Sequence, residues 1–277
     1  HILIYPDGQT NLPRLRRQRR ANPIEQALAL AIGRFEVERG VLVLNERRLP
    51  LDFRGERLSA RLLYEAAGPR YRGSLSFERC SAAALGRLLP TASVESELSL
   101  SAGGLDIRAK MAAERSTAEI AGALENFLAP RMQFSVAGAM DLGEMNGALR
   151  LPAALGGSLQ VNGTFHYRNA SDYGFEGQAR GTGLRVARGR FNAAGIGAAA
   201  AVNIAPRQAA LKRLSISLFG GMFTGEAFIE DWSVLRLAGE ARNLHMPRLI
   251  ASLGRDGGPW SGTISGPLRA EAVMAGA

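Results

Sequence analysis

Residues that commonly carry out chemistry are sparse in this sequence. His1, His166 and His245 are its only histidines, and none has a second metal-ligating residue at a spacing typical of a metal site. His166 lies between Phe165 and Tyr167, where we expect a solvated side chain on the outward face of a strand. The sequence also contains no Walker motif, no dinucleotide-binding glycine pattern and no G-x-S-x-G nucleophile elbow. We therefore predict no metal site and no cofactor.

Acidic residues provide the next candidates, because paired carboxylates can act as general acid and base. The best pairs are Asp52 with Glu56 and Glu226 with Glu230. The members of each pair share one face of a strand, and carboxylates in that pattern normally mark the face in contact with water. We predict that the protein is not an enzyme.

The net charge of +9 comes almost wholly from arginine, because Lys110 and Lys212 are the only lysines. Arginine binds phosphate in a bidentate geometry, so anionic lipid head groups and nucleic acid are conceivable partners, although coding composition also explains the arginine excess. Nucleic-acid binding requires basic residues interleaved with aromatic residues on one sheet face. Arg61 and Arg108 instead alternate with apolar residues, which suits an outer face, so we predict no nucleic-acid partner.

Cysteine usage and hydropathy place few limits on the location of the protein. Cys80 is the only cysteine, so no internal disulfide can form. No stretch approaches the ~20 continuous apolar residues of a membrane-spanning helix, and no signal-peptide pattern occurs at the start. The chain begins at His1 and reads directly into the strand-like residues Ile2–Ile4, so we expect it to be a piece of a longer protein.

The composition favours a mainly β fold. Thirty-three glycines and 6% aromatic residues in a chain of 277 residues fit many short strands and turns better than a helical bundle. In the stretch from Arg34 to Phe77, apolar residues recur at every second position, with an interruption at Gly40. Such alternation gives each strand one apolar and one polar face, and it is typical of an antiparallel sheet.

The same alternation continues along the rest of the chain. Short helices are predicted at Ser81, Asp141 and Pro247, and the region from Leu184 to Val202 has little pattern. No linker or change of composition marks a boundary, so residues 1–277 are predicted to form a single continuous segment.

Three segments, each followed by or containing strands, occur in a particular order along the chain. DGQTNLP at Asp7–Pro13 precedes the strands that begin at Arg34, and LSISLFGGMFTGEAFI at Leu214–Ile229 combines a strand, a paired-glycine turn and a returning strand. NLHMPRLIASLG at Asn243–Gly254 precedes the strand WSGTISGPLRAEA. Together these segments resemble the AsmA-like superfamily, which includes the TamB-type translocation and assembly module proteins.

This resemblance implies an elongated, curled antiparallel sheet, similar in shape to a taco, with an apolar inner groove and a few short helices. It implies a protein of the Gram-negative periplasm, anchored in the inner membrane through a segment absent from this piece. The implied function is to carry phospholipid acyl chains between the inner and outer membranes and to support outer-membrane biogenesis, with membrane-protein partners bound through regions outside this piece. The other hypothesis is a β-rich structural scaffold or adhesin-like passenger with a closed core and no lipid transport.

A continuous apolar groove would suit lipid transfer on physical grounds. Each methylene removed from water contributes ~0.8 kcal/mol, so exposure of an acyl chain of some sixteen carbons would cost on the order of 12 kcal/mol. The residues predicted to line the groove share the inward position on their expected strands. They are Phe35, Val37, Leu49, Leu51, Phe53, Leu62, Leu75, Phe77, Phe134, Val136, Val161, Phe165, Ile216, Leu218 and Phe223. The same residues would form an ordinary core if the sheet closes.

Overall fold

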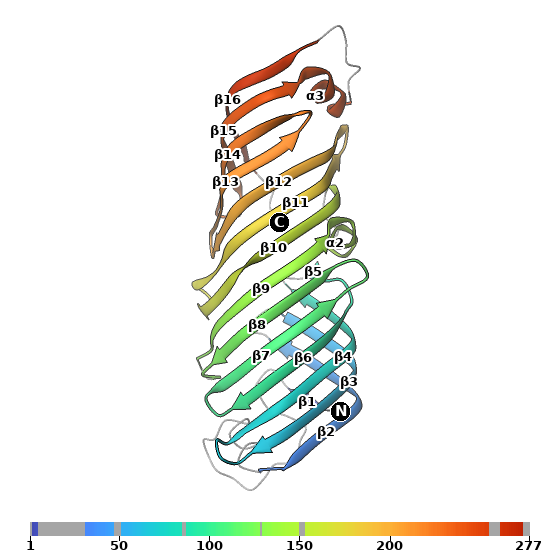
Figure 1. The fold of residues 1–277 in the computed structure, drawn as a ribbon, viewed down its shortest axis with the longest axis vertical. Coiled ribbons are helices and arrows are strands. Elements are labelled where there is room, and N and C mark those ends of the chain that lie inside the picture. Colours follow the sequence, from blue (N-terminus) through green and yellow to red (C-terminus); the bar gives the residue numbers. More distant parts are fainter. Residues whose placement is uncertain are drawn as a thin grey trace. The chain divides into compact units, whose positions relative to one another are not determined.

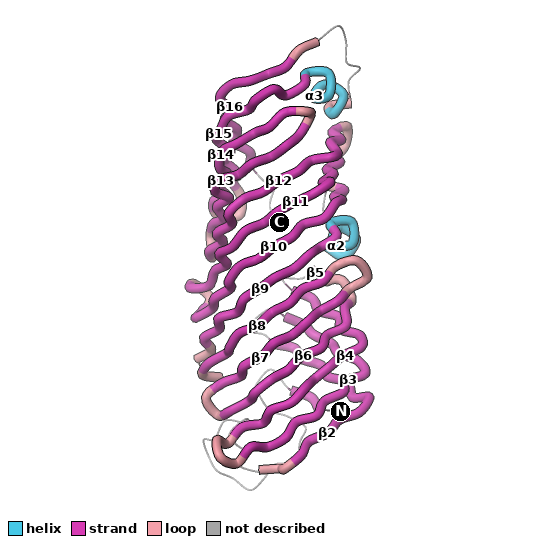
Figure 2. The backbone as a smooth tube through the Cα atoms, viewed as in Figure 1, coloured by secondary structure: helices cyan, strands magenta, loops and turns pink. Residues whose placement is uncertain are grey.

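The structure, a computed structural model, describes residues 2–4, 31–46, 51–84, 87–127, 129–149, 153–254 and 261–273. It divides into two units, His1–Phe134 and Ser135–Ala277, and each unit is considered by itself. Both units consist mainly of antiparallel strands, which confirms the predicted fold class (Figure 1). Figure 2 shows that helices occupy only a small part of the described residues.

The first unit is a meander in which most strands pair with the next one along the chain. Its strands are β1 (Ile2–Ile4), β2 (Arg34–Glu46), β3 (Leu51–Glu65), β4 (Arg70–Ala84), β5 (Arg87–Leu88), β6 (Ala92–Ser101), β7 (Gly104–Ala112) and β8 (Thr117–Glu125). Strand β1 is parallel to β2, and the pairs from β2 to β8 are antiparallel, with the short β5 paired to the end of β4. The next strand, β9 (Arg131–Asp141), contains the boundary between the units.

The second unit repeats the meander. Helix α2 (Leu142–Leu149) precedes β10 (Ala154–Asn169), β11 (Asp172–Arg188), β12 (Phe191–Ala205), β13 (Gln208–Leu218), β14 (Gly221–Glu230) and β15 (Val234–His245). Helix α3 (Met246–Ser252) then precedes the last strand, β16 (Thr263–Val273). From β10 to β16, each strand is antiparallel to its neighbours.

Alternation of side chains determines which face of the sheet each residue occupies. In β7, Leu105, Ile107 and Ala109 are buried or half-buried, whereas Asp106 and Arg108 are exposed. This is the period of two that an extended backbone imposes. In each unit we call the side with the buried and half-buried apolar residues the apolar face, and the opposite side the polar face.

β-Bulges change this alternation at defined points. The pairing of β2 with β3 shifts on both sides of Gly40, and the preceding residue, Arg39, has a φ of 55°. On β3, Arg57 has a φ of 53°, also in the left-handed region that residues other than glycine rarely adopt. An extra residue in a bulge reverses the alternation beyond it, so Val37 and Leu42 both pack against the same buried cluster. The interruption that the sequence predicts at Gly40 is therefore a bulge.

The predicted helices have mixed outcomes. Those at Asp141 and Pro247 are confirmed as α2 and α3. Pro247 lies in the first turn of α3, where a backbone N–H would have no partner within the helix, so the missing N–H of proline costs no hydrogen bond. The predicted helix at Ser81 is wrong, because residues 81–84 continue β4 and pair with residues 51–54 of β3. Alanine has the highest intrinsic helix propensity, but this preference amounts to less than about 1 kcal/mol per residue, and pairing in the sheet outweighs it.

The region from Leu184 to Val202, in which the sequence has little pattern, completes β11 and forms most of β12. Alanine and glycine predominate in it, so its side chains give almost no apolar–polar contrast. Its strand structure comes from pairing on both sides, with β11 and β13 as the neighbours of β12.

Candidate functional site: an apolar sheet face

The predicted lining residues that the structure describes lie on the apolar faces of the two units. Leu49 lies outside the described residues, and Leu51 is described only as part of the backbone of β3. The others are buried or half-buried: Phe35, Val37, Phe53, Leu62, Leu75, Phe77, Phe134, Val136, Val161, Phe165, Ile216, Leu218 and Phe223. Seven of them meet in packed clusters, one in each unit, and the rest occupy separate half-buried positions. Those in clusters are Val37, Phe53, Leu75 and Phe77 in the first unit and Ile216, Leu218 and Phe223 in the second.

The cluster of the first unit is built around Phe77 of β4. Phe77 is 5% exposed and packs with the buried residues Leu58, Ala60 and Cys80. The ring of Phe53 meets that of Phe77 edge to face, with 5.5 Å between centroids and 75° between planes, a favourable aromatic geometry. Burial raises the pKa of the Cys80 thiol to about 11, so the thiol is protonated at neutral pH and acts as a small apolar group. The half-buried residues packed on this cluster are Val37, Leu42, Phe53, Leu75 and Val94.

The cluster of the second unit is built around Phe223 of β14. Phe223 is 4% exposed and packs with buried Leu214 of β13 and Ala227 of β14. Ile216 and Leu218, both predicted to line the groove, pack against these residues. Strands β12, β15 and β16 contribute Ala200, Leu235, Leu237 and Leu268, and β13 also contributes Leu211.

The predicted set omits the most buried partners of these aromatic rings. Leu214 and Ala227 lie in period with Ile216 and Phe223 on their own strands, so the alternation that identified the latter pair identifies the former as well. Leu58 is in period with Leu62 on β3, so alternation identifies its face as well. The bulge at Arg57 separates this run from Phe53, which reaches the same cluster with the opposite parity.

Among the described residues, no second layer takes part in the packed clusters of the apolar face. The cluster around Phe77 contains residues of β2, β3, β4 and β6, and the cluster around Phe223 contains residues of β12 to β16. Helix α2 contacts β10, and α3 contacts β12 and β15. Among the described residues, no large side chain is fully buried. A sheet with one apolar face normally packs that face against another layer or presents it to a hydrophobic partner.

Glycines on the apolar face provide space for aromatic rings to lie against the sheet. Gly163 of β10 pairs directly with Gly177 of β11, and a Cβ added at Gly163 would lie 2.5 Å from Cζ of Phe175. The ring of Phe77 likewise occupies the space that a Cβ at Gly55 would need. These rings therefore cover backbone that has no side chain of its own, and the apolar face stays continuous there.

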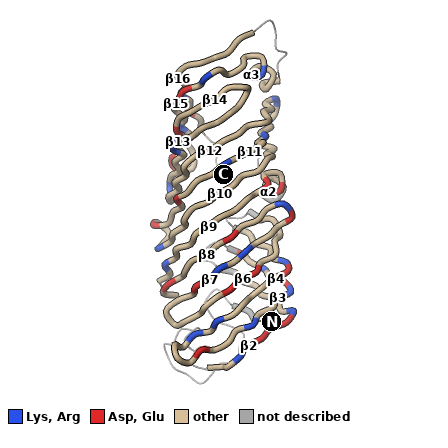
Figure 3. The backbone as a smooth tube through the Cα atoms, viewed as in Figure 1, with Lys and Arg blue, Asp and Glu red and all other residues tan. Residues whose placement is uncertain are grey.

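The polar face of the first unit carries paired charges. Figure 3 shows basic and acidic positions close together along its strands. Glu36 accepts hydrogen bonds from Arg34 and Arg61, which hold the pKa of its carboxyl below the ordinary value. Across the bulge, Arg57 donates a hydrogen bond of 2.6 Å to Glu78. All these side chains are largely exposed, so the pairs add little stability but keep this face hydrated.

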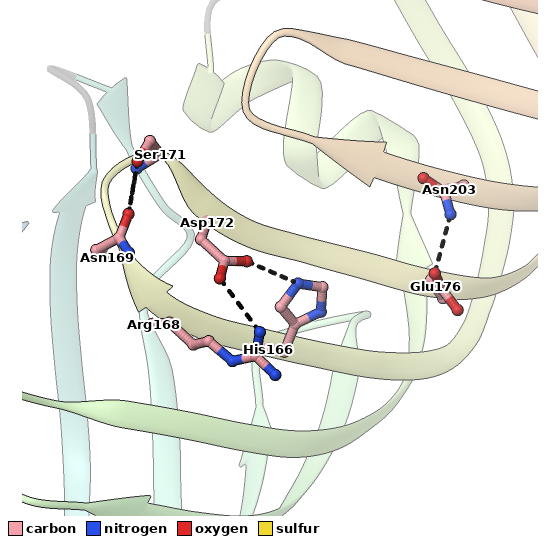
Figure 4. Close-up of polar contacts among 7 residues, drawn as sticks. All are labelled: His166, Arg168, Asn169, Ser171, Asp172, Glu176 and Asn203. Carbon is pink, nitrogen blue, oxygen red and sulfur yellow. Dashed lines mark hydrogen bonds and ion pairs between the residues drawn. The ribbon is translucent and has the colours of Figure 1, made fainter.

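A second polar cluster lies at the β10–β11 hairpin. Figure 4 shows Asp172 between His166 and Arg168. Nε2 of His166 lies 3.7 Å from one carboxylate oxygen of Asp172, and a guanidinium nitrogen of Arg168 lies 3.3 Å from the other. The His166 side chain is 43% exposed, and its ring lies over Gly174, where an added Cβ would be 2.7 Å from Cε1. In the described part of the chain, no group of three or more histidine, cysteine or acidic side chains is arranged to hold a metal ion.

The carboxylates considered as acid–base pairs occupy the hydrated surface. Asp52 and Glu226 are exposed. Glu56 and Glu230 are each engaged by an arginine, at 3.0 Å and 2.6 Å respectively. These contacts are ordinary surface ion pairs, and they do not bring two carboxylates together around a shared space.

The chain matches no family model, and comparison with curated proteins and with solved structures gives no match. Among the described residues, no helix has the length and apolar character needed to cross a membrane. The apolar face, with its clusters around Phe77 and Phe223, is the surface from which a function can be argued.

Proposed function

We propose that the protein binds phospholipid acyl chains on its apolar face and is one segment of a periplasmic bridge that carries them between the inner and outer membranes. The observation that carries this proposal is an apolar face whose packed clusters, around Phe77 and Phe223, include no second layer among the described residues. The resemblance of the sequence to the AsmA-like superfamily supports the same function and links it to outer-membrane biogenesis.

The chemistry of the apolar face fits a hydrocarbon chain. Its side chains are aliphatic and aromatic, and the buried hydroxyl of Ser96 donates to the carbonyl oxygen of Leu75 at 2.8 Å. No buried side-chain polar atom among the described residues lacks a hydrogen-bond partner, so a ligand on this face does not need polar groups to satisfy one. An acyl chain gains ~0.8 kcal/mol for each methylene that leaves water, and its flexibility allows it to follow half-buried side chains.

The polar face is suited to contact with water while the apolar face is occupied. In the first unit, basic and acidic side chains pair across neighbouring strands, as in Arg57 with Glu78 and Lys110 with Glu119. A sheet with these two faces can hold a hydrocarbon ligand on one side while its other side is in contact with water. We expect transfer to occur along the apolar face, with no catalytic step.

Site-specific photo-crosslinking tests this proposal. A photoreactive phenylalanine analogue would replace either Ile216 on the apolar face or Thr224, an exposed residue of the neighbouring strand. After incubation with phosphatidylglycerol-containing vesicles and illumination, mass spectrometry should find a lipid adduct at position 216 and little at position 224. Equal labelling at the two positions, or no labelling at 216, would reject lipid binding on the apolar face.

A further inference from the structure

The polar face of the second unit contains a hollow of about 470 Å³ that the lipid-binding proposal does not use. Strands β10, β11, β12 and β13 line it. The polar residues that line it are Gln160, Asn162, Gln178, Arg180 and Arg213, with Ala199 and Ala201 beside them. The polar members alternate with Leu159, Val161 and Ala179 along β10 and β11, which places them on the opposite face from the acyl chains.

The register of the strands explains why there is a hollow at this position. Gln160 pairs with Arg180, which pairs with Ala199, and Asn162 pairs with Gln178, which pairs with Ala201. Alanines on β12 thus form a low floor beside longer polar side chains. On the other side of β12, a bulge in β13 contributes Arg213, whose φ is 51°.

The hollow is positively charged. Its lining includes two arginines and no carboxylate. Within the described part of the chain, neither Arg180 nor Arg213 forms an ion pair, in contrast to Arg57 and Arg61 on the first unit. Across the bulge, the exposed Glu226 of β14 forms no ion pair with a described residue either. An anion that enters the hollow therefore finds guanidinium groups that are not already neutralised.

Amide side chains complete the polar lining. Gln160, Asn162 and Gln178 each offer both a donor and an acceptor for hydrogen bonds, and such groups suit hydroxyls beside an anion. Guanidinium groups suit the oxygens of phosphate, which they can contact in a bidentate geometry. We propose that this hollow binds a phosphate ester that also carries hydroxyl groups. Soluble sugar phosphates and the glycerol phosphate head groups of lipids share this chemistry.

A binding experiment on the whole chain tests the proposal and separates the two sources. Titration calorimetry would use glucose 6-phosphate, with glucose as the uncharged control, and flotation would use phosphatidylcholine vesicles with and without phosphatidylglycerol. The R180Q/R213Q double variant removes the guanidinium groups of the hollow. The R168Q/R207Q double variant is the matched control, because it removes the same charge from residues paired with Asp172 and Asp231 outside the hollow.

We expect R180Q/R213Q to weaken binding of the phosphate-bearing probe about tenfold or more, as the loss of charge-assisted hydrogen bonds implies, and R168Q/R207Q to weaken it much less. Circular dichroism would verify that both variants remain folded. Binding of glucose 6-phosphate identifies a soluble ligand, and binding of phosphatidylglycerol vesicles alone identifies a head group. No binding of either probe, equal affinity for glucose and its phosphate, or equal weakening by both variants would overturn the proposal. Photo-crosslinking of acyl chains at Ile216 reports on the other face, so either proposal can fail without the other.

Discussion

The ring of Phe223 on β14 lies against the backbone of Gly239 on β15. A Cβ added at Gly239 would be 2.6 Å from Cζ of Phe223 and 2.8 Å from Cα of Gly225, its directly paired residue. Nonbonded carbon atoms do not approach this closely, so a larger residue at position 239 would clash and the position requires glycine. The pair shows how this sheet buries a large aromatic ring without a second layer: the ring covers the strand beside it.

Substitution of Gly239 should therefore disrupt the cluster of the second unit. We expect Gly239→Ala to lower the free energy of unfolding by about 1–3 kcal/mol, because the methyl group meets both the Phe223 ring and the backbone of β14. Urea denaturation followed by circular dichroism would measure the change. Gly103→Ala is the control: its nearest neighbour would be Ser101 Oγ at 3.9 Å, so its effect should stay within about 0.5 kcal/mol. Equal effects of the two substitutions would contradict the packing described for Phe223.

The buried thiol of Cys80 should be almost unreactive in the folded protein. Burial raises its pKa from 9.0 to about 11, and a shift of this size lowers the thiolate fraction at mildly alkaline pH by about a hundredfold. Labelling with Ellman's reagent should be slow in buffer and fast in urea. Since Cys80 is the only cysteine, the absorbance reports on this position alone. Equally fast labelling in both conditions would show that the cluster around Phe77 is open.

Acid should destabilise the first unit through Glu36. Hydrogen bonds from Arg34 and then Arg61 lower the pKa of Glu36 below 4.5, so in the folded state this carboxylate resists protonation. The unfolded chain binds more protons between the two pKa values, and the stability that Glu36 contributes is present above 4.5 and lost as pH falls through the folded pKa. We expect the urea midpoint of the Glu36→Gln variant to decrease less than that of the wild type as the pH is lowered. Glu38→Gln, at an exposed position of the same strand without an ion pair to any described residue, should leave the slope unchanged.

Much of the fold follows from local pattern. Alternation predicts the strands from Arg34 to Phe77, and the break at Gly40 coincides with a bulge because one extra residue reverses the alternation. The helix at Pro247 is evident from a proline that can occupy only the first turn. The strand at Ser81 is not evident, because residues 81–84 are extended only through pairing with β3.

The candidate site is predictable in part for the same reason. Ile216, Leu218 and Phe223 meet in one cluster, as alternation on two neighbouring strands requires. The hollow beside Ala199 and Ala201 has no local signal, since it depends on the register that brings Arg180 and Arg213 to the same alanine strand. Likewise, the position of the Phe223 ring against Gly239 depends on the register of β14 and β15, which local sequence pattern does not give.

Native mass spectrometry of the chain purified after membrane extraction tests the central claim most directly. We predict that the wild-type chain carries phospholipid. Ile216→Arg places a charge on the apolar face and should abolish the bound lipid while the protein remains folded, whereas Thr224→Arg on the polar face should retain it. A wild-type chain without lipid, or an Ile216→Arg variant that unfolds as a closed core would, contradicts an apolar face that binds acyl chains.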